Sequence, residues 1–573
     1  MKRTKFFLTV ALTIGLIVGL AKPLTLLQAQ ATTTHSAHSH IAQTQADHTK
    51  HPKHQLKVRL HKDLGNHHHP ISTKSTLAQR YFDQGLTLAY GFNHAEAARL
   101  FQQAASLDST CAMCYWGEAL VLGPNINAGM EKDALPQAVK AIQKATELKQ
   151  YATPKEQAYI DALAKRYPTQ PVSDRKPFDV AFANAMREVV KQYPDDLDAA
   201  TLFAEALMDT TPWDYWEEDG TPKQTGKEIM ATLESVLQRD PNHAGANHLY
   251  IHAVEKERPD LGIPSADRLM KLVPNSGHLV HMASHIYIRV GRYHDAVVSN
   301  QHGIAADQEY MAAGCHVPGM YPLVYMPHNH HFLWFAASMT GQSKVAIEAA
   351  QQTAKVDEKL MQVPDLGGML QHFSAIPLYT YIRFGKWDQI LSMPAPTADL
   401  KYPNGVWHYA RGKALLAKGQ VQPAIQELEK LRAIAADPAL KEIKVGGFNA
   451  TANILNIASN VLAGELAAQR KDYDSAIAHL KTAVQIEDAL VYTEPADWYQ
   501  PTRQALGAVL LKAGRPQAAE AVYREDLKIY PDNGWSLYGL AQSLQAQKKT
   551  REAKAVQQQF KQAWKYADVS HPL

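Results

Sequence analysis

The chain contains few cysteines, few aromatic residues and almost no net charge. Of its 573 residues 3 are cysteine and 8% are aromatic, and the formal net charge at pH 7 is +3. Proteins that bind nucleic acid usually carry a concentrated basic face. This sequence shows no such face, so we expect no nucleic-acid partner. It also has no HExxH motif, which removes any sequence support for a known zinc-protease pattern.

The cysteines exclude covalently attached haem and leave open whether a disulfide forms. Cys111 and Cys114 form a CxxC pair, and Cys315 stands alone. Because Tyr115 rather than a histidine follows the pair, covalent haem attachment is excluded. No βαβ pattern surrounds the pair, which argues against a thioredoxin-type redox role. A disulfide and an unpaired thiol pair both remain open, and a disulfide would suit an oxidising compartment.

Long apolar runs are missing except at the N-terminus. A basic stretch at residues 1–5 precedes an apolar stretch at 6–20 and a small-residue Ala-x-Ala site at 29–31. This order predicts a signal peptide over residues 1–31, and an uncleaved anchor is the alternative. We therefore expect a periplasmic or otherwise extracytoplasmic protein with no membrane span after cleavage.

Histidine is abundant, with 27 copies, and ten of them lie in a low-complexity segment at residues 32–75. This segment has few apolar residues and cannot bury enough surface to fold alone. We predict a disordered histidine-rich linker. Such tracts can bind Zn, Cu or Ni loosely, although a plain solvated linker fits equally well.

From residue 76 onward the pattern is helical and repeats about every 34 residues. A window that opens at Ala78 has small or aromatic residues at its 8th, 20th, 24th and 27th places, namely Gly85, Ala97, Phe101 and Ala104. The pattern returns in the windows 405–438, 457–490 and 500–567, and it is weaker across 112–270. A helix pair of this size cannot bury its apolar face alone, so we expect stacked pairs that share one continuous core.

This spacing resembles that of the tetratricopeptide repeat, a helix-turn-helix unit. The stretches at 111–119, 248–255 and 277–287 are similar to those of an uncharacterised family of exported bacterial tetratricopeptide-repeat proteins. The resemblance covers most of residues 78–567. It implies an all-α fold, a tetratricopeptide-repeat α-solenoid built as a superhelix of antiparallel helix pairs over 76–567, with a C-terminal tail at 568–573. It implies no particular reaction.

Two short stretches place metal-ligating side chains on one face of a helix. The first contains His248, His252 and Glu255 at i, i+4 and i+7; the second contains His278, His281 and His285 at i, i+3 and i+7. At 100° per residue each trio lies within a narrow stripe. Each stripe is therefore a candidate set of metal ligands.

The repeat alignment relates these histidines to one another. When the middle repeats are aligned on Ala266, Ala296 and Ala346, the second place holds His248, His278 and His328, the fifth holds His281 and His331, and the ninth holds His285. In tetratricopeptide repeats these places line the concave groove, so the resemblance implies a histidine-lined inner surface. Neighbouring first helices should lie about 8–10 Å apart.

Neutral imidazole is a good ligand for Zn, Cu, Ni and Fe, and three such ligands leave a coordination position open. We predict that one divalent transition metal, with Zn or Cu favoured, is held by a subset of His248, His252, Glu255, His278, His281, His285, His328 and His331. The alternative is a set of partly buried histidines that are hydrogen-bonded within a helical bundle. No catalytic residue is assigned.

Three further acidic residues each have a functional and a structural interpretation. Glu118 and Glu205 lie in apolar helical runs, where each could be a metal ligand, a partner that orients a ligand, or a general base. The structural alternative is a hydrogen-bond partner between helices. The polar and aromatic loop at 494–503 is either a second recognition surface or a turn closed by an ion pair between Glu494 and Arg503.

These features support three functions. The first is an exported scaffold that binds a protein or peptide in its groove and holds a metal ion in its central repeats. The second is a metal-dependent hydrolase or oxidase. The third is metal handling, in which the histidine-rich segment captures ions and passes them inward.

Overall fold

Consecutive helices of this chain pack against each other in antiparallel pairs, and each pair packs against the next. The computed structural model describes residues 58–314, 319–364 and 366–572. Residues 54–573 form one compact unit. The predicted signal peptide, the first part of the predicted linker and Cys315 lie outside the described residues. Within the described ranges, no helix has both the length and the apolarity needed to cross a membrane.

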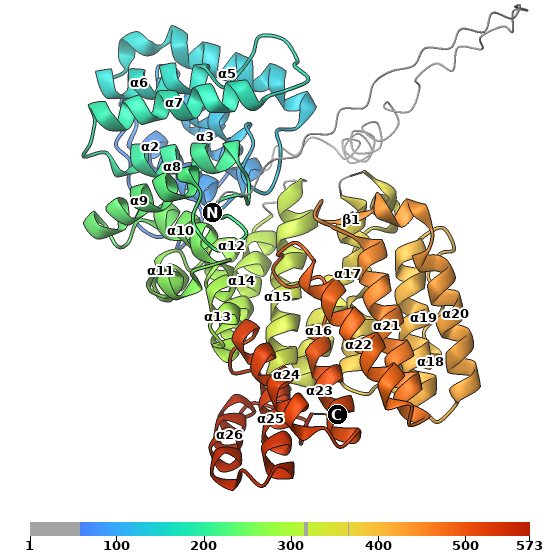
Figure 1. The fold of residues 1–573 in the computed structure, drawn as a ribbon. Coiled ribbons are helices and arrows are strands. Elements are labelled where there is room, and N and C mark those ends of the chain that lie inside the picture. Colours follow the sequence, from blue (N-terminus) through green and yellow to red (C-terminus); the bar gives the residue numbers. More distant parts are fainter. Residues whose placement is uncertain (1–57, 315–318, 365, 573) are drawn as a thin grey trace, which may run out of the picture. The chain divides into compact units, whose positions relative to one another are not determined.

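The helices follow one another with short connections (Figure 1). Those before residue 313 are α2 (Thr76–Tyr90), α3 (His94–Leu107), α4 (Ala112–Val121), α5 (Leu135–Glu147), α6 (Pro154–Ala164), α7 (Lys176–Gln192), α8 (Leu197–Thr210), α9 (Gln224–Arg239), α10 (Ala244–Val254), α11 (Pro259–Leu272), α12 (Gly277–His281), α13 (Ala283–Arg289) and α14 (Tyr293–Ala312). Those after residue 325 are α15 (Met326–Met339), α16 (Ser343–Thr353), α17 (Gly367–Arg383), α18 (Trp387–Ser392), α19 (Lys401–Ala417), α20 (Val421–Ala435), α21 (Thr451–Gln469), α22 (Tyr473–Asp488), α23 (Thr502–Lys512), α24 (Pro516–Ile529), α25 (Gly534–Ala546) and α26 (Thr550–Ala563).

Other regular structure is short. The 3₁₀ segments are η1 (Lys132–Ala134), η2 (Lys149–Tyr151), η4 (Glu358–Gln362) and η5 (Pro438–Lys441), and η3 (Tyr321–Tyr325) is a π-helical turn. Strands β1 (Lys444–Val445) and β2 (Asn449–Ala450) form a small antiparallel pair before α21. The predicted all-α solenoid is therefore confirmed.

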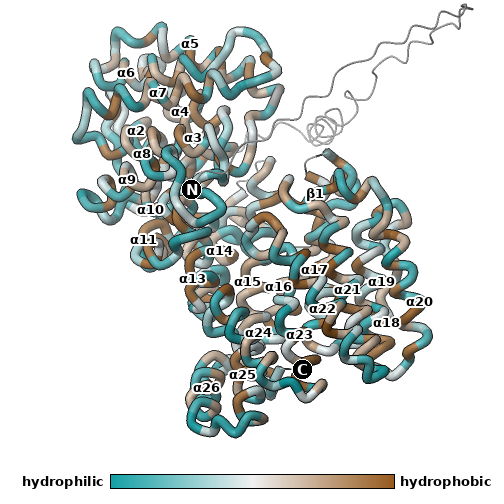
Figure 2. The backbone as a smooth tube through the Cα atoms, viewed as in Figure 1, coloured by the Kyte–Doolittle hydropathy of each residue, from teal (hydrophilic) through white to brown (hydrophobic). Residues whose placement is uncertain are grey.

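Small residues allow the close helix crossings that the repeat pattern predicts. Phe101 of α3 lies between Gly85 of α2 and Gly117 of α4, where an added Cβ would come within 2.8 Å and 2.5 Å of its ring. Tyr523 of α24 lies in the same way between the glycines at the corresponding places of α23 and α25. The Phe101 and Tyr523 rings thus each join one repeat to the next. Apolar and polar residues alternate along most helices (Figure 2).

The turn inside a helix pair has a fixed backbone conformation. At the 15th place of the repeat, Gly419 and Gly514 have φ values of 73° and 70°, which glycine adopts without steric cost. The same place in the first repeat is Phe92, with a φ of 55°. Lys471, at this place in the window 457–490, has a φ of 61°. A left-handed conformation costs a residue with a side chain roughly 1–2 kcal/mol, so the turn keeps this conformation even where glycine is absent.

The described ends of the chain are anchored on the middle of the solenoid or on its first repeats. Near the C-terminus, the Trp535 indole donates to the Ser338 carbonyl at 2.9 Å, and Asp568 accepts from the backbone N–H of Ser343 at 2.7 Å. Asp568 thereby caps the N-terminus of α16.

The disulfide between Cys111 and Cys114, one of the two alternatives left by the sequence, forms at the start of α4.

Residues 58–75, which we predicted to belong to a disordered linker, pack on the first repeats. Leu64 is 4% exposed and His69 is 3% exposed. Four polar side chains of this segment bond to carboxylates of later helices, in the pairs His61 with Glu96, His69 with Asp198, Ser72 with Glu156, and Thr73 with Asp108. The prediction was wrong here because composition does not reveal buried acceptors elsewhere in the chain.

Asp198 of α8 is the main anchor of this segment. Its carboxylate lies 2.8 Å from His69 Nδ1 and 3.0 Å from His67 Nε2. It also accepts from the Tyr90 hydroxyl at 2.6 Å and lies 3.2 Å from His243 Nε2. Burial acts to raise the pKa of Asp198, but the histidines and their hydrogen bonds hold it well below its usual value. One carboxylate thus joins the N-terminal segment to α2, α8 and α10.

Replacing Asp198 with alanine should lower the free energy of unfolding by about 3–5 kcal/mol, because Tyr90, His69 and His243 lose a buried hydrogen-bond partner and His67 loses its ion-pair partner. Urea unfolding followed by circular dichroism would measure the change. The matched control is Asp195→Ala, which alters an exposed carboxylate in the same turn and should leave stability almost unchanged. Equal stability of the two variants would show that Asp198 is no anchor.

Candidate metal centre

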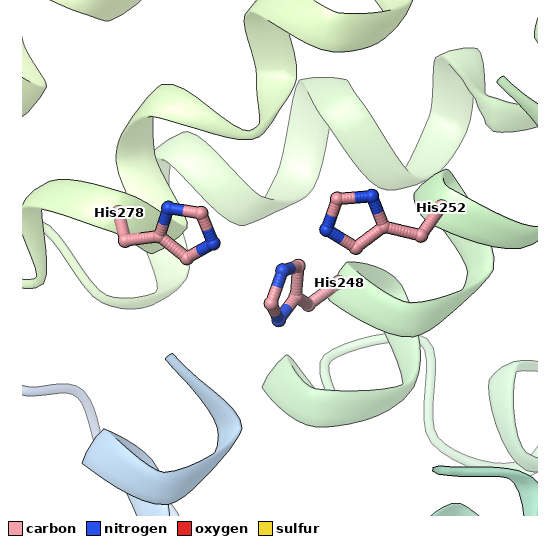
Figure 3. Close-up of side chains that lie close together, drawn as sticks. All are labelled: His248, His252 and His278. Atoms are coloured by element: carbon pink, nitrogen blue, oxygen red, sulfur yellow. The ribbon is translucent and has the colours of Figure 1, made fainter. Parts of the chain in front are cut away.

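Three histidines from two neighbouring repeats converge at the first candidate site. His248 and His252 lie one turn apart on α10, and His278 comes from α12. Their rings point toward one another (Figure 3). Ring centroids are 4.8 Å apart for His248 and His252 and 5.0 Å apart for His248 and His278. One nitrogen of each ring lies within 4.8 Å of the others. We call these residues the first triad.

Outer hydrogen bonds orient the rings of the first triad. His248 Nδ1 lies 2.6 Å from the Tyr90 carbonyl oxygen, which can only accept. Nδ1 therefore carries the proton, and Nε2 presents a lone pair. His252 Nδ1 lies 3.4 Å from Glu255 Oε1, which favours the same tautomer. This arrangement, in which one nitrogen is held by an oxygen and the other is free, is typical of metal-binding histidine.

The inward-facing nitrogens of the first triad have no hydrogen-bond partner among the described residues. This holds for Nε2 of His248 and His252 and for both ring nitrogens of His278. All three residues are at most 3% exposed. A buried polar atom without a partner costs about 1–3 kcal/mol. A bound cation would supply the missing partner for all three rings.

Two aromatic residues in unusual conformations cover the first triad. The Phe92 ring lies 4.6 Å from the ring of His248 and 5.7 Å from that of His278. The Trp213 ring lies 5.1 Å from that of His252. Both residues have positive φ, 55° and 62°. The positive φ of Phe92 belongs to the turn of the repeat and is shared by Lys471, so the backbone strain specific to this site is that of Trp213.

A second triad lies beside the first and consists of His281 of α12, His285 of α13 and His328 of α15. Centroid distances are 4.9 Å for His281 and His285, 5.0 Å for His281 and His328, and 5.7 Å for His285 and His328. One nitrogen of each ring lies within 4.8 Å of the others. His281 Nε2 and His285 Nε2 are 3.0 Å apart.

Outer groups orient this triad as well. The Asn300 amide nitrogen donates to the Ala296 carbonyl at 2.7 Å, so its oxygen faces His281 Nδ1, also at 2.7 Å. On the other side, His285 Nδ1 lies 3.0 Å from a Glu255 oxygen and 2.8 Å from a Glu494 oxygen. Both Nδ1 atoms therefore carry protons, and both Nε2 atoms face the interior of the triad.

Burial keeps most of these rings neutral. It lowers the pKa well below the usual value of 6.5, with further lowering by neighbouring histidines, for His248, His252, His278, His281 and His328. His285 is the exception: burial acts to lower its pKa, but Glu255 and Glu494 raise it to about 9. Burial in turn raises the pKa of Glu494 to about 7. At neutral pH five of the six rings are in the form that binds metal.

The structure groups the predicted residues differently from the two helical stripes. His278 joins the α10 histidines, and the break in the helix at Met282 lies between His281 and His285. Glu255 lies between His252 and His285, on the Nδ1 side of both rings, and the three residues form a further group whose ligand atoms lie within 4.8 Å of one another. His331 belongs to neither triad; its ring stacks on Trp334 at 5.2 Å. The packing between helices, and not the spacing within one helix, determines which histidines share a triad.

The expected open groove is also corrected. All members of the triads except His328 are at most 4% exposed, so they line an interior and not an accessible concave surface. The repeat positions were aligned correctly: α10 with α11, α12 and α13 with α14, and α15 with α16 each form a helix pair. What the alignment could not show is that the 490–501 loop and the Phe92 turn cover these positions.

Glu494 is the contact that sequence reasoning missed. The predicted ion pair with Arg503 does not form, because Arg503 pairs with Asp488 at 2.6 Å and Glu494 lies against His285. Glu494 also accepts from the Tyr492 hydroxyl and lies 3.8 Å from Arg289. The only sequence signal was an acidic residue in a dense polar and aromatic loop.

A pocket of about 140 Å³ lies on the outer side of Glu494. Its walls include Arg289, Glu487, Tyr492, Asp497, Trp498 and Tyr530. Since one Glu494 oxygen faces His285, a single carboxylate separates this pocket from the second triad. The lining combines charged side chains with aromatic and aliphatic ones.

The other candidate carboxylates lie elsewhere. Glu118 accepts from the amides of Gln102 and Gln137 at 2.8 and 2.9 Å, which is a hydrogen bond between helices. Burial raises the pKa of Glu205 to about 8, and repulsion from Asp209 adds to this. Neither carboxylate lies in a histidine triad.

The cluster around Asp198 also brings histidines together, yet its hydrogen bonds argue against a metal. His243 Nδ1 accepts from the backbone N–H of Ala246 at 3.2 Å. The proton of the neutral ring must therefore be on Nε2, which faces Asp198 as a donor and cannot bind metal. This cluster is a structural anchor.

Comparison with known proteins gives only distant likenesses. No protein-family model matches the chain. No curated protein matches its sequence either. Among solved structures, the APC/C hetero-tetramer Cut9-Hcn1 is 13% identical with a TM-score of 0.29 over 82% of this chain and 76% of that one. The human IFIT1 dimer with m7Gppp-AAAA is 13% identical with a TM-score of 0.31, over 80% and 90%. The P58(IPK) TPR domain is 12% identical with a TM-score of 0.23, over 83% and 99%.

Replacing Glu255 with glutamine should lower the pKa of His285 from about 9 toward its usual 6.5, because the carboxylate that raises this pKa most is removed while burial remains. Titration of histidine signals by NMR in the metal-free protein would measure the shift. Glu257→Gln is the matched control. Glu257 lies two residues after Glu255 and pairs with Lys256 rather than with His285. An unchanged His285 pKa would refute the role assigned to Glu255.

Proposed function

We propose that this protein is a metal-binding α-solenoid that holds a divalent transition metal at His248, His252 and His278. The proposal rests on one observation: inward nitrogens of three buried rings face one another without a hydrogen-bond partner among the described residues. A cation at their centre would pair with all of them. Each ring that has an outer bond is also held in the tautomer that such a cation needs.

The donor set selects the kind of metal. Three neutral imidazoles favour Zn, Cu, Ni or Fe over Mg and Ca, which prefer oxygen. Zn or Cu remains our first choice. Three protein ligands leave a fourth position for water or another small ligand. The aromatic cover from Phe92 and Trp213 would limit exchange of that ligand with bulk water.

The solenoid itself supports a scaffold role. Its repeats offer long helix faces on which a protein or peptide partner can dock. Nucleic acid is not proposed as a partner, because the sequence has no concentrated basic face. We place the protein in the periplasm or another extracytoplasmic space, because the N-terminal sequence has the order of a signal peptide. In this role the metal would stabilise the central repeats.

The pocket beside Glu494 favours a metal-dependent enzyme as the second candidate. Its lining combines Arg289 with carboxylates and aromatic rings next to the second triad. A polar substrate held there would lie close to the histidines. Testing hydrolase and oxidase substrates on metal-loaded protein would distinguish this candidate from a scaffold.

Protein purified without a histidine tag or metal column should contain at least one tightly bound transition-metal ion per chain. The variant His248→Ala should lose it, because two rings cannot replace three. The control His331→Ala alters a buried histidine outside the triads and should keep the ion. Elemental analysis by mass spectrometry after dialysis against a weak chelator would measure both. Retention of all metal by His248→Ala would overturn the proposal.

Metal binding at the first triad should be nearly independent of pH between 8 and 6. The neutral ring is the ligand, and the pKa values of His248, His252 and His278 lie well below 6.5, so protons do not compete in this range. Exposed histidines with ordinary pKa values would lose affinity about tenfold per ligand and pH unit below about 6.5. Chelator competition with Zn(II) at several pH values would distinguish the two behaviours.

A further inference from the structure

The two triads are neighbours in space as well as in sequence. The His252 and His285 rings are 5.4 Å apart, and the His278 and His281 rings are 5.7 Å apart. These distances are similar to those within each triad. Six imidazoles from α10, α12, α13 and α15 therefore form one continuous cluster.

The second triad can hold a cation in place of a proton. His281 Nε2 and His285 Nε2 are 3.0 Å apart, and the Nδ1 atoms of both rings lie against oxygens. Because the pKa of His285 is raised to about 9, its Nε2 carries a proton at neutral pH and donates to His281 Nε2, and a metal ion that displaces this proton would be bound by both nitrogens. Two ligands about 2.0–2.1 Å from one metal ion are themselves roughly 3.0–3.4 Å apart. A shared proton serves only two nitrogens, whereas His328 brings a third.

One carboxylate connects the two triads from outside. Glu255 Oε1 lies 3.4 Å from His252 Nδ1, and Glu255 Oε2 lies 3.0 Å from His285 Nδ1. Outer carboxylates of this kind orient imidazole and increase its basicity toward a metal. Because Glu255 contacts one ring of each triad, it fixes their relative orientation. The negative charge of the Glu255 carboxylate would also offset part of the repulsion between two metal cations.

We propose that the two triads form a single dinuclear centre, in which His248, His252 and His278 hold one transition-metal ion and His281, His285 and His328 hold a second. This proposal rests on the proposed function, since it adds a second ion to the first site. In known two-metal sites the ions are about 3.5–4 Å apart. Each ion retains open positions, and a bridging oxygen ligand such as hydroxide can occupy one on each.

The charged groups around the centre suit two cations. Glu255 and Glu494 both contact His285, and Arg289 lies 3.8 Å from Glu494 on the side of the pocket. Two carboxylates thus lie directly against the outer side of the second triad, and Arg289 lies beside one of them, Glu494. The pocket lies behind Glu494, which contacts the outer Nδ1 atom of His285 and separates the pocket from the inward Nε2 atoms.

The test uses Cu(II) ions, full-length protein and three variants. Metal-free chains are loaded with Cu(II), and loosely held ions are removed with a weak chelator. His248→Ala disrupts the first triad, and His328→Gln disrupts the second at its least buried member. His372→Gln is the matched control, because His372 is a buried histidine bonded to Tyr402 outside both triads. Circular dichroism checks folding, and elemental analysis and electron paramagnetic resonance (EPR) report the copper.

The proposal predicts about two tightly bound ions in the wild-type and control chains, with an EPR intensity well below that of two independent Cu(II) ions because nearby spins couple. His328→Gln should hold about one ion fewer and recover the full signal of one. Two uncoupled ions would overturn the dinuclear centre. One wild-type ion that is kept by His328→Gln and lost by His248→Ala would overturn it and leave the proposed function intact. Absence of tightly bound ions from all chains would overturn both.

Discussion

Burial of neutral imidazole is the constraint on which the central part of this structure depends. The triad histidines lie where α2, α10, α12, α13, α15 and the 490–501 loop meet, and five of the six are almost fully enclosed. Each uncompensated ring nitrogen costs free energy that the surrounding core must offset. The aromatic cover and the turn at Phe92 are needed for the same reason. Water between these elements would satisfy the nitrogens and remove the requirement for a cation.

The repeat supplies the geometry that brings these rings together. First helices of neighbouring repeats pack side by side, so residues at equal places face the same interior. Histidines at the second place of consecutive repeats, His248 and His278, therefore meet. In the second triad the contact joins different places, since His281 at the fifth place meets His328 at the second place of the next repeat. A partner one turn along the helix adds a third ring in each case. The solenoid thus builds two similar triads from a small number of substitutions in a repeated unit.

The fold and the choice of histidines could be predicted from sequence, because both follow from local periodicity. Small residues at Gly85 and Gly507 mark close helix crossings, and these contacts are present. The pairing of histidines into triads could not be predicted, because it depends on which rings cross from one helix to the next. Glu494 comes from a loop more than 200 residues away from His285. The order of residues 58–75 likewise depends on Asp198, which no local pattern connects to His69.

The cluster at Asp198 shows what a purely structural arrangement of histidines looks like in this protein. There, His67, His69 and His243 all lie against one carboxylate, and one ring also caps a helix. In the first triad the situation is opposite: outer nitrogens are bonded while inward ones are not. Both clusters are buried in the same fold, so burial alone does not explain the difference. A set of rings whose free lone pairs converge has the electrostatics of a cation site, and the strained Trp213 turn beside it is retained at a cost in stability that packing elsewhere in the core must offset.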